Sequence, residues 1–226
     1  MSEQPEKTEK PKGRDDLGPM GEHRTVIATI ADVTGNPGPL GLMAFGMTTV
    51  LLNLHNAGFY GLNSMIIGMG VFYGGIAQVI AGIMEWKKNS TFGMTAFLSY
   101  GLFWLTLVAL WVVETIWPDE FTTDGTAAGW YLFAWGVFTG LMFVATLRIN
   151  RALQVVFGTL TVLFVLLAIG KWVGDGTFLG MEGVAWTKIA GYEGIVVGLS
   201  AVYASIAQVW NDAYGRTVLS LGPVGK

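Results

Sequence analysis

Long apolar runs separated by short polar stretches make up most of the chain after residue 35. Each run has about 20 residues, the length that a helix needs to cross about 30 Å of hydrocarbon. The runs predict six membrane crossings, at about 36–58, 65–85, 92–113, 130–147, 152–172 and 189–210. The fold class that this pattern indicates is an all-α membrane protein with six transmembrane helices in a permease domain over 36–212.

The two ends of the chain are hydrophilic. Residues 1–35 have no apolar core followed by a small-residue cleavage site, so they do not resemble a signal peptide. Within them, apolar residues at helical spacing between His23 and Gly35 are consistent with a short amphipathic helix on the membrane surface. We expect 1–35 and 213–226 to be cytoplasmic tails.

The composition supports a membrane protein and excludes several other classes. Hydrophobic residues make up 52% of the chain and charged residues 13%, against about 25% charged in soluble domains. Cysteine is absent and the net charge is only −3, which argues against thiolate metal sites and a nucleic-acid partner. Catalytic motifs such as H-E-x-x-H or G-x-S-x-G do not occur. We therefore expect no enzyme activity, no cofactor and no metal.

The distribution of Lys and Arg predicts the orientation of the helices. With the amino terminus in the cytoplasm, eleven basic residues lie on the cytoplasmic side and only Lys171 and Lys188 outside. This asymmetry obeys the positive-inside rule. Six crossings return the carboxyl terminus to the cytoplasm, and we expect a multi-pass protein with the lipid bilayer as its surroundings.

Charged side chains fall near the predicted helix ends, where they reach the interface at little cost. Those closest to the membrane are Glu85, Glu114, Arg148, Lys171 and Glu193. Without a deep Lys or Arg to hold an anion, a pathway suits a small solute that is neutral or becomes so. Short carboxylic acids, urea, amides, glycerol and ammonia all meet this condition.

Neutral polar residues within the crossings are candidates for lining such a pathway. Asn53 and Gln78 are the stronger ones, because a primary amide must satisfy two donors and two acceptors. His55 lies close to a helix end and fits a hydrated interfacial position equally well. Ser99, Thr159 and Thr161 can line a path, although such hydroxyls more often bond their own helix backbone.

The start of the first crossing offers a different kind of site. Asn36 is a good N-cap and Pro37 a good first helical residue. The amides of Gly38 and Leu40, with the helix dipole behind them, are then placed to face a carboxylate. An alternative stays open, that this turn only fixes where the helix enters the membrane. Spacings of the G-x-x-x-G type at 70–74, 136–140 and 194–198 indicate close helix contacts.

Several segments resemble a known family. The sequence Asn-Pro-Gly-Pro-Leu-Gly-Leu at 36–42 is similar to the N-P-A-P-L-G-L signature of the acetate uptake transporter family, with Gly38 in place of Ala. The resemblance continues through 51–56, 72–78, 89–93, 95–101 and 103–105 and ends at 215–219. It is greatest for the bacterial succinate–acetate/proton symporter branch, which implies a location in the prokaryotic cytoplasmic (inner) membrane.

The resemblance implies a permease for acetate and succinate, proton-linked or channel-like. It also implies a ring-shaped hexamer in which each protomer has its own pathway. The family's constriction is formed by a Phe, a Tyr and a Leu, which correspond to Phe45, Tyr100 and Leu160. Tyr100 can offer its hydroxyl at this constriction. A urea or short-amide channel, or a sensor that keeps the fold without transport, stays open as an alternative.

Overall fold

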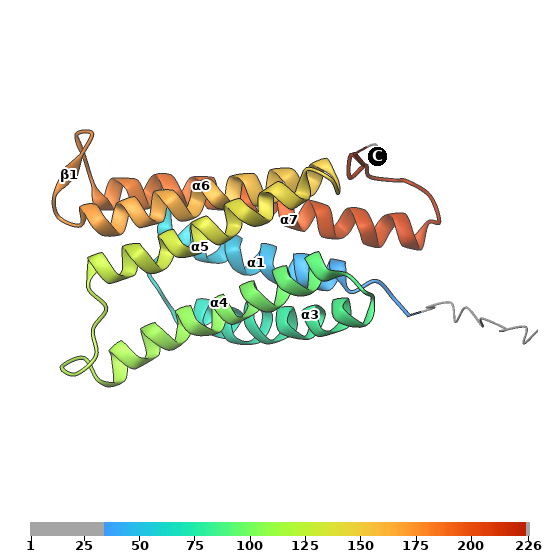
Figure 1. Cartoon of the computed structure of the whole chain (residues 1–226). Helices are drawn as coiled ribbons and strands as arrows, with labels where there is room; N and C mark the ends of the chain where they lie inside the picture. Colours follow the sequence, from blue (N-terminus) through green and yellow to red (C-terminus); the bar gives the residue numbers. More distant parts are fainter. Residues whose placement is uncertain (1–33, 225–226) are drawn as a thin grey trace, which may run out of the picture. The chain divides into compact units, whose positions relative to one another are not determined.

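The computed structural model describes residues 34–224, and these are almost entirely helical (Figure 1). The predicted amphipathic helix between His23 and Gly35 lies almost wholly outside the described residues. Helices α1 (Gly38–Asn56), α4 (Thr91–Ile116), α5 (Gly125–Thr146), α6 (Arg151–Val173) and α7 (Gly183–Ala213) run up and down in one bundle. The remaining long helix is built from α2 (Ser64–Gly68), η2 (Met69–Ala77) and α3 (Gln78–Lys87).

Five of these helical segments are long and apolar enough to span a membrane, namely Ser64–Lys87, Thr91–Ile116, Gly125–Thr146, Arg151–Val173 and Gly183–Ala213. Helix α1 has 19 residues and is not among them, because Asn53, His55 and Asn56 make its last turn polar. The described chain is therefore a multi-helix membrane protein, in agreement with the class predicted from the apolar runs.

Side-chain caps define where four of the helices begin. Asn63, Ser90, Asp124 and Asn150 each precede a helix and accept a hydrogen bond from a backbone N–H of its first turn. These bonds satisfy amides that have no partner within the helix. The cap at Asp124 explains why α5 begins at Gly125, five residues before the start that the apolar pattern predicted.

Helix α7 is also longer than predicted. A hairpin that pairs β1 (Thr177–Phe178) with β2 (Met181–Glu182) leads directly into Gly183. Its turn residues Leu179 and Gly180 have φ angles of 52° and 75°, as two-residue hairpins of the right twist require. The helix therefore begins at Gly183, six residues before the start of the predicted crossing at 189.

The second crossing contains a feature that the sequence did not predict. Residues Met69–Ala77 form a π-helix of nine residues within an otherwise α-helical segment. Its Gly74 and Gly75 lie against α4, where added methyl groups would come within 2.9 Å of Trp104 and 2.6 Å of Leu105. Wide helical turns of this kind are rare and often adjoin functional sites. Gln78 is the first residue after it.

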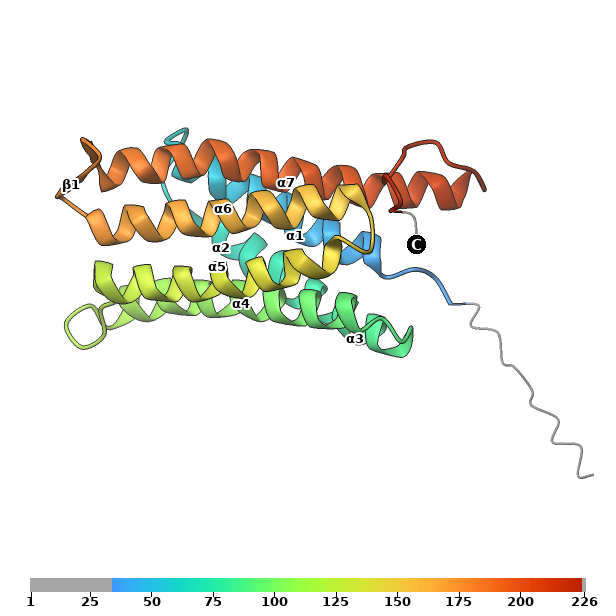
Figure 2. The ribbon, with the colours of Figure 1, turned by 45° about the horizontal axis from the view of Figure 1, so that its top comes forward.

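Helix α1 occupies the interior of the bundle. Figures 1 and 2 show it running between the α6–α7 pair and the α3–α4 pair. Ten of its 19 residues are buried. Its backbone approaches α7 closely: a methyl group added to Gly198 would lie 2.7 Å from the carbonyl oxygen of Gly46. Side chains tie the start of α1 to the end of α7, since Ser205 Oγ donates to the Pro39 carbonyl over 2.6 Å.

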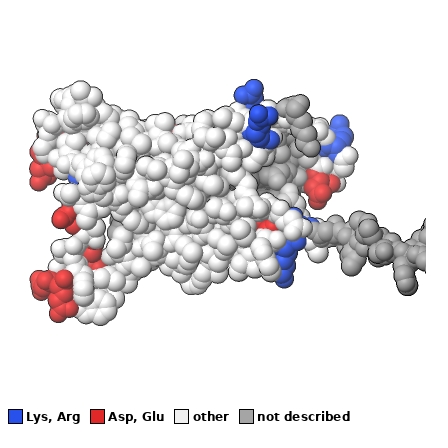
Figure 3. Space-filling model, in the orientation of Figure 1, with Lys and Arg blue, Asp and Glu red and all other residues white. Residues whose placement is uncertain are grey.

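The charged residues divide between the two ends of the bundle. Figure 3 shows Lys and Arg gathered at one end, Asp and Glu mainly at the other, and a broad uncharged band between them. The carboxyl-terminal segment folds back at the basic end, where the Leu221 and Gly222 carbonyls accept from the first amides of α6. Asn211 holds this segment through three hydrogen bonds to Val218 and Leu219.

The glycine spacings lead to a matched pair of substitutions. Gly198→Ala places a methyl group against the backbone of α1, whereas the same change at Gly140 places it at an ordinary 3.6 Å from Thr161. Overpacking costs about 1–3 kcal/mol, while Gly to Ala in an unhindered helix gains about 1 kcal/mol. We expect Gly198→Ala to lower the thermal unfolding midpoint in detergent and Gly140→Ala to maintain or raise it. Equal midpoints would contradict the backbone contact.

Candidate functional site

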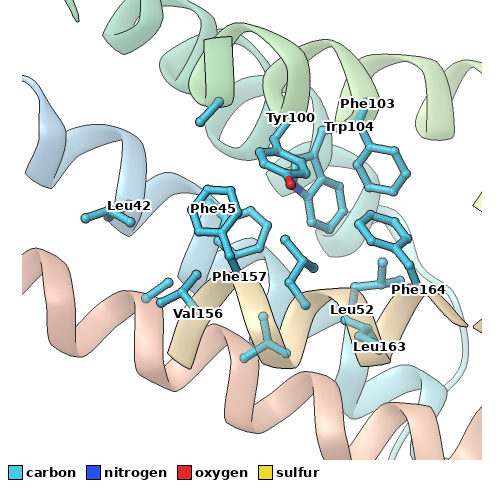
Figure 4. Packing of buried hydrophobic residues seen from close by; sticks show 14 of the residues in the cluster. Leu42, Phe45, Leu52, Tyr100, Phe103, Trp104, Val156, Phe157, Leu163 and Phe164 are labelled. Atoms are coloured by element: carbon cyan, nitrogen blue, oxygen red, sulfur yellow. The ribbon is translucent and has the colours of Figure 1, made fainter. Parts of the chain in front are cut away.

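The three residues expected at a constriction meet in the centre of the bundle. Phe45 on α1, Tyr100 on α4 and Leu160 on α6 are 6%, 3% and 2% exposed, and all three line one small cavity. The Phe45 and Tyr100 rings lie 5.7 Å apart between centroids. Phe157, which was not predicted from the sequence, lies 6.0 Å from Tyr100 between ring centroids (Figure 4). Together these four side chains form a constriction, which we call the ring.

This cavity is narrow and mostly apolar. Its volume is about 20 Å³, enough for about one water molecule and too little for acetate. The other lining residues are Leu42, Gln78, Ala96, Phe97 and Val156. Among the described residues, Gln78 and Tyr100 supply its only polar side chains, so the ring is closed to hydrated ions in this conformation.

A larger vestibule of about 260 Å³ adjoins the ring at the basic end of the bundle. It shares Leu42, Ala96, Phe97 and Phe157 with the narrow cavity. Its polar lining residues come from five helix ends: Asn36, Glu85, Ser90, Asn150 and Gln208. The vestibule therefore connects the ring to one face of the bundle through hydrogen-bonding groups.

A second aromatic layer lies on the other side of the ring. Phe103 stacks on Tyr131 at 5.9 Å and meets Phe164 and Trp135 edge-on at 5.3 and 5.1 Å. Figure 4 shows Phe103 and Phe164 facing each other across the bundle. Beyond it, a cavity of about 100 Å³ contains Glu114 and Lys171. Along the bundle, a cavity with polar lining residues therefore lies on each side of the apolar ring and the aromatic layer.

The Tyr100 hydroxyl is hydrogen-bonded to a neighbouring helix. It lies 2.9 Å from Thr139 Oγ1 on α5, and Thr139 in turn donates to the Trp135 carbonyl over 2.7 Å. Because Thr139 has a single proton, already committed to Trp135, Tyr100 must be the donor. Thr139 was not identified from the sequence, where it resembles any other helical threonine.

Two of the three residues that were expected to face a carboxylate at the start of the first helix lie at the vestibule. Asn36 and Gly38 line the vestibule, but the Gly38 amide donates to Asn36 Oδ1 over 2.9 Å and is not free for a substrate. Asn36 also donates to Gln208 Oε1 over 3.0 Å. Leu40 lines neither cavity and is 37% exposed.

The remaining pathway candidates are engaged elsewhere, and none lines the ring or the vestibule. Asn53 donates to Thr49 O and accepts from Asn56, with Gly194 of α7 against it. His55 contacts the Tyr60 carbonyl at 2.9 Å and stabilises the turn after α1. Thr159 and Thr161 bond the carbonyls of their own helix, and Ser99 is half-buried beside Tyr100.

One charged residue lies farther from a helix end than predicted. Glu193 was placed near a helix end, but α7 begins at Gly183, so Glu193 is ten residues, or about 15 Å, into the helix. Its Oε2 is buried and has no hydrogen-bond partner among the described residues. The expectation that Glu193 lies within about a turn of a helix end is therefore wrong, and Glu193 lines neither the ring nor the vestibule.

A bundle of long apolar helices around a closed ring, with polar cavities on both sides, defines an integral membrane protein of the permease or channel class. Comparison with known proteins agrees. Residues 21–223 match the model of the GPR1/FUN34/yaaH family, and the chain belongs to this family. The membership expected from the 36–42 motif is thereby confirmed.

Individual relatives cover most of the chain. The Escherichia coli (strain K12) protein named succinate-acetate/proton symporter SatP is 52% identical over 83% of this chain and 95% of its own length. A solved structure, titled as the bacterial acetate channel SatP, has 50% identity and a TM-score of 0.78, covering 84% of this chain and 99% of that one. Ammonia transport outward protein 2 of Saccharomyces cerevisiae is 34% identical over 77% of this chain and 61% of its own length. These relatives are transport proteins, which agrees with the expectation that the chain is not an enzyme.

Because Tyr100 donates to Thr139 and Thr139 donates to Trp135, removing either hydroxyl should have a different effect on stability. Thr139→Val leaves the buried Tyr100 hydroxyl unpaired, at a cost of about 1–3 kcal/mol, whereas Tyr100→Phe leaves Thr139 still bonded to Trp135. We expect Thr139→Val to lower the unfolding midpoint in detergent more than Tyr100→Phe does. The double variant should recover part of the loss. Additive effects of the two changes would contradict the assigned donor.

Proposed function

We propose that the chain is a permease for acetate and related short carboxylates such as succinate, moving them with protons or in a channel-like manner. The observation that carries this proposal is the apolar ring of Phe45, Tyr100, Leu160 and Phe157, joined directly to a polar vestibule. The names of the E. coli relative and of the similar solved channel support the same substrate class.

The ring explains how such a permease limits what passes. A hydrated inorganic ion would lose its water shell among hydrocarbon side chains, which provide no compensating ligands. A short carboxylic acid has an apolar end that suits the ring and a polar end that suits the vestibule. Passage requires Phe45, Phe157 or Leu160 to move, because the cavity of about 20 Å³ does not hold the substrate.

We further propose that α1 is a sixth crossing, with the basic end of the bundle in the cytoplasm. Its 19 residues span about 28 Å at 1.5 Å per residue, and its burial against α7 compensates for its polar last turn. The charge division in Figure 3 supports this orientation under the positive-inside rule. Both tails, 1–35 and 213–226, are then cytoplasmic, in the inner membrane of a prokaryotic cell.

The assembly is proposed to be a ring-shaped hexamer in which each protomer conducts separately. Support comes from the family resemblance and from the many exposed apolar side chains on the outer helix faces, among them Leu141 at 70% and Val144 at 61%. Such a surface is suited to lipid or to neighbouring copies. The pathway, by contrast, is complete within one chain.

Reconstitution in proteoliposomes tests the transport function. We expect uptake of labelled acetate to exceed that of protein-free vesicles and to exceed uptake of urea. An imposed gradient with the outside more acidic should raise the initial rate, because it supplies protons on the side from which the acid enters. A rate that does not change with this gradient would contradict proton linkage. Urea flux equal to or above acetate flux would favour an amide channel instead.

A further inference from the structure

A groove of about 380 Å³ lies between α6 and α7, apart from the ring and the vestibule. Its walls are the first turn of α6, the facing part of α7 and the carboxyl-terminal segment 220–222. None of its lining residues lines the narrow cavity or the vestibule. Ligand sites usually have volumes of about 300–1,000 Å³, so the groove is large enough to be a separate binding site.

Arg151 is the one charged residue that lines this groove. Its stem packs against the carboxyl-terminal segment, since a methyl group added to Gly222 would lie 2.7 Å from Arg151 Cβ. Among the described residues the guanidinium has a single hydrogen-bond partner, Gln154 Oε1 at 3.0 Å. An arginine has five N–H donors. Most of them therefore remain available to a negatively charged ligand.

The polar side chains that α7 adds to the groove are already bonded within the chain. Ser200 donates to the Val197 carbonyl over 2.7 Å, and Tyr203 donates to the Ser220 carbonyl over 2.8 Å. Most of the remaining lining is hydrocarbon. The groove thus presents one cation beside an apolar surface.

Exposed hydrocarbon continues from the groove along both helices. Val155 and Val162 lie two turns apart on one face of α6, Val196 and Tyr203 have the same spacing on α7, and all four are about half exposed. Each pair covers about 10 Å along its helix. Arg151 begins the segment Arg151–Val173, which is long and apolar enough to cross a membrane. The cation therefore lies at the expected membrane boundary, and the hydrocarbon extends into the bilayer from it.

A phospholipid with an anionic headgroup has the chemistry that this arrangement requires. Its phosphate suits an arginine, its acyl chains suit the exposed valines, and the cytoplasmic leaflet carries a negative surface potential. A second copy of the chain is a poorer match for Arg151. Among the acidic residues of the described chain, only Glu85 and Asp212 lie at the basic end, and Glu85 is buried.

We propose that the groove between α6 and α7 binds an anionic phospholipid of the cytoplasmic leaflet, with its phosphate on Arg151 and an acyl chain along Val155 and Val162. A guanidinium can bind a phosphate through two parallel hydrogen bonds. The bound lipid also contacts 220–222 and so holds this segment against α6. This site is distinct from the transport pathway and rests only on the proposed location of the basic end in the cytoplasm.

Native mass spectrometry of the purified protein tests the binding directly. Delipidated protein in a mild detergent is titrated with phosphatidylglycerol, or with phosphatidylcholine of the same acyl chains. We expect phosphatidylglycerol to bind at one molecule per chain and about fivefold more tightly than phosphatidylcholine. Inorganic phosphate at the same concentration should not displace it. Equal binding of the two lipids, or displacement by phosphate, would overturn the proposal.

A charge variant then locates the headgroup. Arg151→Gln should lower the affinity for phosphatidylglycerol about fivefold and leave that for phosphatidylcholine unchanged. Arg216→Gln is the matched control, because it removes the same charge beyond the end of α7 and outside the groove. We expect this control to bind as the unaltered protein does. Equal losses in the two variants would indicate a diffuse attraction to the basic end and refute the site.

A second variant tests the hydrocarbon part of the groove. Val155→Trp fills it at a half-exposed position that a large side chain can occupy without disturbing the core. We expect it to weaken phosphatidylglycerol binding although Arg151 remains, whereas Leu141→Trp, on the exposed face of α5, should have no effect.

A neighbouring copy in the groove would give a different result. Val155→Trp would then lower the mass of the assembly and leave lipid binding unchanged, and the proposal would be wrong. None of these measurements uses acetate flux. Failure of the proposed transport function would therefore be seen separately from failure of the lipid site.

Discussion

The close contact of α1 with α7 is the constraint on which the rest of the structure depends. The backbone of α1 can run inside the bundle only because Gly46 faces Gly198 and because Gly191 and Gly194 leave room for the chain at Ala57 and Asn53. Small residues of this kind let helices approach in a membrane, where the hydrophobic effect gives little drive for association. The position of Phe45 at the ring follows directly from this contact.

Once α1 is held in place, the hydrogen bonds of the polar groups around it determine which polar atoms remain unpaired in the interior. Asn53 satisfies its amide within α1, so the carboxyl-terminal part of that helix has a structural role. The Tyr100 hydroxyl is hydrogen-bonded to Thr139, so Tyr100 contributes only its aromatic face to the wall of the cavity. Gln78 is different, because its acceptor has no partner among the described residues. The hydrocarbon walls of the ring therefore adjoin a residue whose amide oxygen is unpaired.

Much of the fold was predictable from the sequence, and the misses have physical causes. The runs of apolar residues predicted most of the helices, and the family resemblance implied that Phe45, Tyr100 and Leu160 form one constriction. Helix α7 begins earlier than predicted because Gly183 follows a tight hairpin, and Glu193 therefore lies farther from the helix start than expected. The π-helix was missed because its hydrogen-bond shift leaves the apolar pattern unchanged.

The candidate site was less predictable than the fold, because hydrogen-bond partners depend on tertiary neighbours. No pattern in the sequence distinguishes Thr139, which holds Tyr100, from Thr159 and Thr161, which bond only their own helix. The free amide of Gly38 was expected from helix-end rules, yet Asn36 occupies it. In each case the sequence showed that the residue can form hydrogen bonds, but it did not show which partner the residue would bond.

The most direct measurement of the central claim, that substrate passes through the ring within one chain, is a block at the ring's entrance. The protein has no cysteine, so Ala96→Cys places a single thiol where the vestibule and the narrow cavity meet. A methanethiosulfonate reagent should modify it and stop acetate flux in proteoliposomes, and a reducing agent should restore the flux. Complete modification of the thiol with undiminished flux would contradict the pathway.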